Sequence, residues 1–523
     1  MASHSGRSAA HAGIEKVKGY GQRVGGSIKG EEDESFVQLR KENLMRMVGR
    51  DPRYLTMDGW ATYGFNNRRY MIESQLLLAK TTGRIPVIPD VVWARKCSVD
   101  VQTCADNALI YLEHRNQHQE MLASTWNEPG RAYKLGLEHF IDMNHLRKVF
   151  GPFLTYSEYF TLYDIPASSL DESLRWNATG YNPAGMNTST LSESQFQNQS
   201  FVRTDQPLME RNLETLSEDT ALFSKQVVDE ALSGKVAWPL PRVREELEKK
   251  GVPIEMEDEE LLSRLERLDY VPLYTYTDEV LMNKALSRPT IEIALRSKTQ
   301  ALTATLSSPP YNDTSIVYLQ GNLHDQRKPG SVYFSTRKAR DDFTEMVVNG
   351  IRAPKRIRIV GERVAKRMEE RVEGSRWVAA HLRRGDFVGI AWSPSKDADV
   401  HFNKTRGALD EGVKVLGKHF EDRLPRLNDP FYLATDESNS TYLEHYRSAG
   451  AVLLSDLLLP SDLAYLGPIS SYNDILALVE QQVLARSDFF AGSELSSTTG
   501  GAVNVRTGLG KEEWSWSIVK RDG

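Results

Sequence analysis

Short apolar runs alternate with longer segments of helical apolar spacing along much of this chain. Near the start, residues 54–57 predict a buried strand, and residues 85–88 predict a second one. The segment between them, residues 66–82, has the spacing of a helix, and Gly83 stands where a glycine commonly ends one. The order strand, helix, strand is typical of the units that build a parallel sheet.

The same alternation returns more clearly in the last third of the chain. Apolar residues recur every four positions from Val360 to Val372 and predict a helix of about four turns. Further strands are predicted at residues 378–381, 431–434, 451–454 and 489–491, with helices through Tyr442 and Tyr446 and at 473–486. Strands that alternate with such helices predict a second parallel, Rossmann-like domain.

At 523 residues the chain is too long for one ordinary hydrophobic core, so we expect two domains. Residues 1–50 predict a disordered tail, rich in Ser, Gly, Ala and Lys, and then a leading helix. We place an N-terminal Rossmann-like domain at residues 51–310 and a C-terminal one at 311–523. Residues 168–260 are rich in Ser, Asn, Gln and Glu and predict an insertion in the first domain. Its local helices are predicted at residues 244–251 and 258–268.

Composition narrows the range of partners. The net charge of -6 gives no general attraction to nucleic acid or to an anionic membrane surface. There is no run of about 18 apolar residues and no apolar N-terminal core, so membrane attachment would need an anchor absent from this sequence. The chain has only two cysteines, Cys97 and Cys104, which are too few for a Cys-rich zinc module. They can form one disulfide or remain two free thiols. Six glycosylation sequons favour the secretory lumen, in the endoplasmic reticulum or Golgi. They begin at Asn177, Asn187, Asn198, Asn312, Asn403 and Asn439.

A first candidate site follows the predicted strand that ends at His381. Polar side chains at the carboxyl end of a parallel strand stand at the sheet edge where α/β proteins bind ligands. Arg383 and Arg384 offer planar guanidinium groups there that match the oxygens of a phosphate or diphosphate. The alternatives are a surface arginine pair in salt bridges with Asp386, and a histidine that is merely buried with its own hydrogen-bond partner.

A second candidate site opens the first predicted helix. Gly64, Phe65 and Asn66 follow a strand, and backbone N–H groups at a helix start can hold an anion or sugar hydroxyls. An ordinary helix cap is the alternative.

A third candidate site lies near the C-terminus. The carboxylate of Glu480, on a predicted helix, can accept from the edge of a purine. Ser496, Ser497 and Thr498 follow a predicted strand, and their hydroxyls can donate to phosphate oxygens. A surface glutamate and an ordinary Ser/Thr loop are the alternatives.

In their order along the chain, these segments resemble the protein O-fucosyltransferase family. The shared features are a Gly-Phe-Asn loop, a His-x-Arg-Arg-x-Asp strand end and a Gly-x-x-x-Ser-Ser segment. They stand here at residues 64–66, 381–386 and 492–497, with further family-like stretches at 140–146 and 432–436. The likeness spans about residues 53–506 outside the insertion. The opening is most similar to the type that fucosylates thrombospondin repeats.

The resemblance implies a GT-B architecture, in which two Rossmann-like domains face a cleft. It also implies an inverting transfer of fucose from GDP-fucose, with no metal and no other cofactor. Arg383 would clamp the β-phosphate, and His381 and Asp386 would contact or orient groups at the nucleotide. Glu480 would stand at the base. The remaining matched residues would line the phosphates, ribose or fucose: Gly64, Phe65, Asn66, Ser496, Ser497 and Thr498.

Two positions depart from the family pattern. Thrombospondin-type enzymes place a glutamate, the candidate base, before Gly-Phe-Asn, whereas this chain has Tyr63. A tyrosine has an ordinary pKa of about 10 and is a poor proton acceptor at neutral pH. Thr498 replaces an aromatic residue that is common in the family and so removes a packing surface.

The leading hypothesis is therefore an O-fucosyltransferase that acts on a hydroxyl of a protein or glycan. One alternative is a family member that binds GDP-sugar or a protein partner with little or no catalysis, which Tyr63 would favour. The other is a transferase for a different nucleotide sugar, because a phosphate clamp does not specify the hexose.

Overall fold

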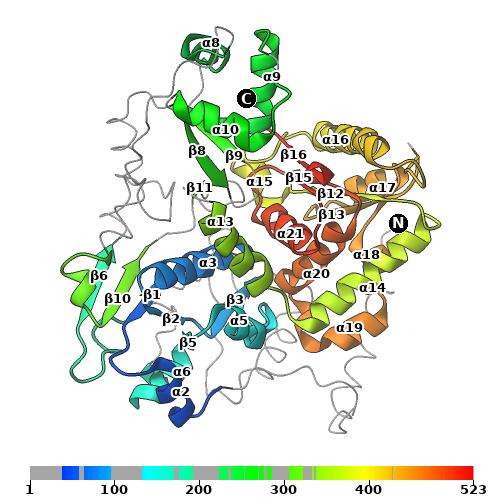
Figure 1. Cartoon of the computed structure of the whole chain (residues 1–523). Helices are drawn as coiled ribbons and strands as arrows, with labels where there is room; N and C mark the ends of the chain where they lie inside the picture. Colours follow the sequence, from blue (N-terminus) through cyan, green and yellow to red (C-terminus); the bar gives the residue numbers. More distant parts are fainter. Residues whose placement is uncertain are drawn as a thin grey trace. The chain divides into compact units, whose positions relative to one another are not determined.

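The computed structural model describes residues 38–57, 64–95, 132–169, 176–192, 223–233, 237–252, 254–268, 270–275, 280–284, 306–321, 333–334, 337–426 and 428–521. They belong to two compact units. The N-terminal unit comprises Leu39–Asp90 and Arg147–Ile351, and the C-terminal unit contains Val91–Leu146 and Arg352–Gly523. Each unit is built on a parallel five-stranded sheet (Figure 1).

The sheet of the N-terminal unit has the strand order β5-β2-β1-β10-β6, and all neighbouring strands are parallel. Its strands are β1 (Tyr54–Met57), β2 (Ile85–Ile88), β5 (Leu154–Thr155), β6 (Thr188–Ser192) and β10 (Ile316–Gln320). The next two strands along the chain, β2 and β5, lie on one side of β1, and the last two, β6 and β10, lie on its other side. The strand order therefore reverses between β1 and β10. Open α/β sheets bind ligands outside the carboxyl ends of strands at such a reversal.

Helix α3 (Phe65–Thr81) follows β1 and is buried on nearly all sides, not on one face alone. Its polar residues are therefore paired inside the protein. Arg69 Nε donates to Glu73 Oε1 at 2.9 Å, which offsets the cost of burying both charges. Gln75 Nε2 donates to one backbone oxygen of β1 and one of β2, at 3.0 and 2.7 Å. The helix is thereby fixed to both strands.

The sheet of the C-terminal unit has the order β14-β13-β12-β15-β16 and is also parallel throughout. Its strands are β12 (Val378–Leu382), β13 (Phe431–Thr435), β14 (Ala451–Val452), β15 (Phe489–Ser493) and β16 (Trp516–Val519). Counted along the chain, this is the 3-2-1-4-5 order of doubly wound nucleotide-binding folds, and it reverses between β12 and β15.

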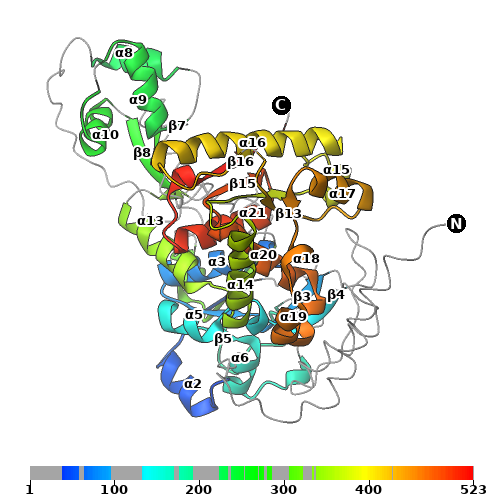
Figure 2. The same ribbon diagram turned by 90° about the vertical axis from the view of Figure 1, so that its right-hand side faces the viewer.

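Helices cover both faces of this second sheet (Figure 2). Helix α16 (Ala398–His419) packs Phe402 and Leu416 against apolar side chains of the strands. On the other face, α14 (Lys355–Arg371) packs against α20 (Asn473–Arg486). Because the sheet is covered on both faces, β12, β13, β14 and β15 carry buried residues in consecutive rather than in alternate positions.

The predicted insertion at residues 168–260 is only partly correct, because residues 188–192 form β6 of the first sheet. The later residues belong to a small module that has a core of its own and extends beyond residue 260. Its antiparallel sheet has the order β11-β8-β9-β7. The strands are β7 (Ala237–Pro239), β8 (Tyr270–Thr275), β9 (Val280–Lys284) and β11 (Tyr333–Phe334), and the helices are α8 (Lys225–Ala231), α9 (Leu240–Lys249) and α10 (Asp258–Arg267). Trp238, Val243, Leu247 and Leu265 belong to its buried cluster. The two helices predicted here are confirmed, whereas the strands escaped prediction.

The predicted α/β fold with two Rossmann-like domains is confirmed, and the facing of the two across a cleft stays a prediction. The leading helix is present as α2 (Lys41–Val48). The structure divides the chain differently from the predicted boundary at residue 310, because β10 pairs with β1 in the first sheet. Residues 91–146, which include the antiparallel strand pair β3 (Val91–Arg95) and β4 (Ala132–Gly136), group with the C-terminal unit.

Within the described ranges, no helix is long and apolar enough to cross a membrane. Residues 1–37, where the disordered tail is predicted, lie outside the described residues, as do Tyr63, Cys97 and Cys104.

Two glycines of α16 offer a matched test of how this helix packs on the sheet. A Cβ at Gly412 would stand 2.2 Å from Cδ1 of Phe489 on β15, whereas one at Gly407 would meet nothing within 4 Å. We expect Gly412→Ala to lower the free energy of unfolding by about 1–3 kcal/mol, because the ring or the helix must shift. Gly407→Ala should raise it by up to about 1 kcal/mol, since alanine favours a helix. Urea unfolding measures both, and equal effects would contradict this packing.

Candidate functional site

The carboxyl ends of β12 and β15 lie side by side where the strand order of the C-terminal sheet reverses. Arg383 follows β12 directly, and α21 (Ser497–Gly508) begins after a short turn from β15. The Ser493 hydroxyl joins the two strand ends. It donates to the backbone oxygen of His381 at 2.7 Å and accepts from the backbone N–H of Arg383 at 3.0 Å. The structure therefore brings the first and third predicted segments together.

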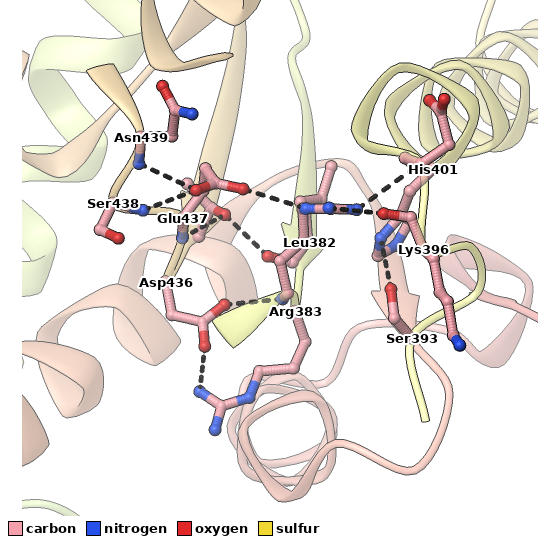
Figure 3. Close-up of polar contacts among 12 residues, drawn as sticks. Leu382, Arg383, Ser393, Lys396, His401, Asp436, Glu437, Ser438 and Asn439 are labelled. Atoms are coloured by element: carbon pink, nitrogen blue, oxygen red, sulfur yellow. Dashed lines mark hydrogen bonds and ion pairs between the residues drawn. The ribbon is translucent and has the colours of Figure 1, made fainter. Parts of the chain in front are cut away.

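The Arg383 side chain lies at this edge between two carboxylates and is 23% exposed. Its Nη2 is 2.5 Å from Oδ1 of Asp386. Its Nη1 is 2.8 Å from Oδ2 of Asp436 (Figure 3). The guanidinium also lies over the Phe387 ring, 5.0 Å from its centroid. A guanidinium has five N–H donors, so two ion pairs fix its plane and still leave donors for an anion.

Arg384 is buried and points into a different environment. Its Nε donates to Oε2 of Glu437 at 3.0 Å, and its two Nη atoms donate to the backbone oxygens of residues 395–397. The contacts with the backbone oxygens join the end of β12 to the loop before α16. Of the two guanidinium groups expected to offer donors to a phosphate, only that of Arg383 stands at the edge. Arg384 instead has a structural role, because it joins Glu437 to the loop before α16.

Asp436, which follows β13, fixes the conformation of this strand end. Its Oδ1 accepts from the backbone N–H of Arg384 at 2.7 Å while its Oδ2 pairs with Arg383. A Cβ at Gly385 would stand 2.0 Å from that same Oδ2, so position 385 has no room for a side chain. Sequence analysis assigns Asp436 no site role. The available signal was its place directly after an apolar strand, the same place that Arg383 has after β12.

His381 is buried beneath the edge and is 4% exposed. Its Nδ1 lies 3.0 Å from the Thr499 hydroxyl, which itself donates to the backbone oxygen of Ser493 at 3.0 Å. Nδ1 therefore carries the hydrogen. Burial, and then the positive charge of Arg383, lower the pKa of His381 to about 3, so the ring is neutral at physiological pH. In the structure His381 hydrogen-bonds to Thr499 of α21. A contact between His381 and a nucleotide stays a prediction.

The start of α21 carries the three hydroxyl residues expected near phosphates. Ser496 is the N-cap and its side chain makes no capping hydrogen bond, while Ser497 and Thr498 are the first helical residues. The N-terminus of a helix has N–H groups and the positive end of the helix dipole, both of which favour an anion. Contact between these residues and phosphate stays a prediction.

The turn between β15 and α21 is tight. Leu495 has a φ of 61°, a left-handed conformation that is rare for leucine. A Cβ at Gly492 would stand 2.2 Å from Cγ2 of Thr499, so glycine allows the helix to approach the strand this closely. Strained backbone is often found at functional sites, where the surrounding structure maintains it.

Glu480 lies on α20 and is partly buried. Desolvation and the negative charge of Asp436 raise its pKa to about 8. The carboxyl group is therefore mostly protonated at pH 7. An N–H group of a purine would favour its ionised form, because only a carboxylate accepts at both oxygens.

Gly64, Phe65 and Asn66 lie in the N-terminal unit. Gly64 is the N-cap of α3, and the side chains of Phe65 and Asn66 are buried. Because α3 follows β1, these residues come after the strand at which the order of the first sheet reverses. Their contact with a ligand bound at Arg383 stays a prediction.

No protein-family model matches the chain, and no curated protein matches it. Among solved structures, POFUT1 in complex with GDP-fucose is similar at 10% identity over 91% of this chain and 100% of that chain, with a TM-score of 0.38. The fucosyltransferase NodZ from Bradyrhizobium is similar at 11% identity over 86% of this chain and 92% of that chain, with a TM-score of 0.33. The structural resemblance to fucosyltransferases is therefore distant.

The raised pKa of Glu480 predicts a pH-dependent stability. Because the folded-state pKa of about 8 exceeds the ordinary 4.5, ionisation opposes folding. This cost is absent below pH 4.5, grows as the pH rises towards 8 and is complete above it. The free energy of unfolding of Glu480→Gln, measured relative to that of wild type, should therefore rise by roughly 2–4 kcal/mol between pH 5 and pH 9. Urea unfolding at both pH values measures this, and a pH-independent difference would contradict the raised pKa.

Proposed function

We propose that this chain is a glycosyltransferase that transfers fucose from GDP-fucose to a hydroxyl group of a protein or glycan acceptor. The observation that carries the proposal is the position of Arg383 and the N-terminus of α21 on adjacent strand ends at the order reversal of the C-terminal sheet. A guanidinium and a helix N-terminus both attract phosphate oxygens, so one diphosphate can engage both. The resemblance of the sequence motifs to O-fucosyltransferases supports fucose as the sugar.

In the proposed reaction the acceptor oxygen attacks the anomeric carbon on the face opposite the diphosphate. The bond from that carbon to the β-phosphate oxygen breaks, its electron pair leaves with GDP, and the acceptor proton passes to a base or to water. Negative charge therefore grows on the diphosphate as the bond breaks. A positioned guanidinium stabilises such charge by about 3–4 kcal/mol, roughly 10²- to 10³-fold in rate.

The contacts of Arg383 suit this role because they hold the group in place before the reaction begins. Asp386 and Asp436 fix its two Nη atoms from different elements, and the Phe387 ring supports one face. A charge that is already oriented needs no rearrangement when the transition state forms. The two carboxylates thus act as positioning residues.

A location in the secretory lumen belongs to the same proposal. Glycan-bearing asparagines must lie on the surface. Of the five sequon asparagines that the structure describes, Asn177, Asn187, Asn403 and Asn439 are exposed, whereas Asn312 is half-buried. This exposure fits glycosylation and supports the proposed compartment.

Replacement of Arg383 tests the proposed catalytic role. We expect Arg383→Ala to lower the rate of GDP release from GDP-fucose by roughly 10²- to 10³-fold, because the leaving diphosphate loses its main cation. Arg383→Lys should lower this rate less, since lysine keeps the positive charge but cannot form the bidentate hydrogen bonds of a guanidinium. Calorimetry with GDP, GDP-fucose and GDP-mannose, run beside the release assay, separates binding from turnover. Near-native turnover of the alanine variant would contradict the role, and tight binding by wild type without turnover would favour a binding protein.

Two glycines of α15 (Gly385–Gly389) test whether Asp436 positions Arg383. A Cβ at Gly385 would collide with the Asp436 carboxylate, whereas one at Gly389 would meet nothing within 4 Å. Gly385→Ala should therefore displace the carboxylate and lower the affinity for GDP by about tenfold or more. Gly389→Ala should leave the affinity unchanged. Calorimetric titration with GDP compares the two, and equal affinities would refute the positioning role of Asp436.

A further inference from the structure

Trp392 is a large aromatic side chain that the proposed reaction does not yet use. It lies in the loop of residues 390–397, between α15 and α16, and is 44% exposed. Ala391, the residue before it, has a φ of 57°, a left-handed backbone conformation that is uncommon for alanine. Exposure of so large an apolar ring costs free energy, and such rings are often found where a ligand covers them.

The loop that carries Trp392 is held rigidly. Arg384 donates to the backbone oxygens of Ser395, Lys396 and Asp397, at 3.3, 2.9 and 3.3 Å. The Ser393 hydroxyl lies 3.1 Å from Nδ1 of the buried His401 (Figure 3). Buried polar contacts of this number fix one conformation of the loop. The loop that carries Trp392 is therefore already ordered before a ligand binds, which lowers the entropy cost of binding to this ring.

Trp392 is also connected to the proposed phosphate site. Its ring packs edge to face on Phe387, with centroids 5.6 Å apart and an interplanar angle of 87°. Phe387 in turn lies under the Arg383 guanidinium, 5.0 Å from its ring centroid. The backbone N–H of Trp392 donates to the backbone oxygen of Phe387 at 2.9 Å. One ring thus separates the exposed indole from the cation assigned to the diphosphate.

We propose that Trp392 is a stacking surface for the purine base of the nucleotide whose diphosphate binds Arg383. This inference rests on the proposed function, since it needs a nucleoside diphosphate at Arg383. A purine is the large flat ring that the donor carries on the same diphosphate, and tryptophan stacks on such rings through its π face.

Calorimetric titration with GDP and with inorganic pyrophosphate tests this inference, because pyrophosphate has the phosphates without the base. We expect Trp392→Ala to weaken GDP binding by about tenfold or more, the usual effect of losing a base–aromatic stack, and to leave pyrophosphate binding unchanged. Trp392→Phe should keep most of the GDP affinity. Val400→Ala is the matched control, since Val400 is equally exposed, at 44%, and lies in the first turn of α16.

Equal GDP affinity of wild type and Trp392→Ala would overturn the inference. An equal loss of GDP and pyrophosphate affinity in that variant would also overturn it, because the phosphate site would then be disturbed. If Trp392→Ala raises the KM for the acceptor and leaves the GDP affinity unchanged, the indole ring contacts the acceptor. That result would refute stacking on the purine base. If wild type binds neither compound, the proposed function itself fails, whereas wild-type binding with no effect of the tryptophan refutes only this inference.

Discussion

The ion pair between Arg383 and Asp436 is the interaction on which the candidate site depends. It joins the carboxyl ends of two adjacent parallel strands, with Nη1 and Oδ2 2.8 Å apart. The same carboxylate accepts from the backbone N–H of Arg384 and excludes any side chain at Gly385. Together with burial, which is the larger cause, its charge raises the pKa of Glu480. One aspartate therefore sets the orientation of the cation and the backbone beside it.

The two consecutive arginines have different tasks because they belong to different local structures: Arg383 directly follows β12, whereas Arg384 is the N-cap of α15. Arg383 stays at the edge of the sheet, whereas Arg384 is buried against Glu437 and the loop before α16. Burial of a guanidinium is favourable only when its donors are satisfied, and Arg384 satisfies them with a carboxylate and backbone oxygens. The second arginine thus supports the loop that presents Trp392, and the first remains available for a ligand.

Sequence patterns located the local elements well, because apolar periodicity reflects burial on strands and helices. Residues 54–57, 85–88 and 473–486 match β1, β2 and α20 residue for residue. Long-range pairing has no such local signal, so β10 was assigned to the wrong side of the domain boundary and the strands of the insertion were missed. For the site, the edge position of Arg383 followed from its place after a strand. The partner Asp436 lies 53 residues away from Arg383 along the chain, and only the pairing of β12 with β13 brings them together.

A crystal structure of the protein with GDP would show directly whether the C-terminal sheet binds a nucleoside diphosphate where its strand order reverses. We expect diphosphate oxygens within hydrogen-bond distance of the Arg383 guanidinium and of the backbone N–H groups that open α21, with the Arg383–Asp436 pair intact. GDP bound away from both, with Arg383 still in contact only with its two carboxylates, would refute this binding site.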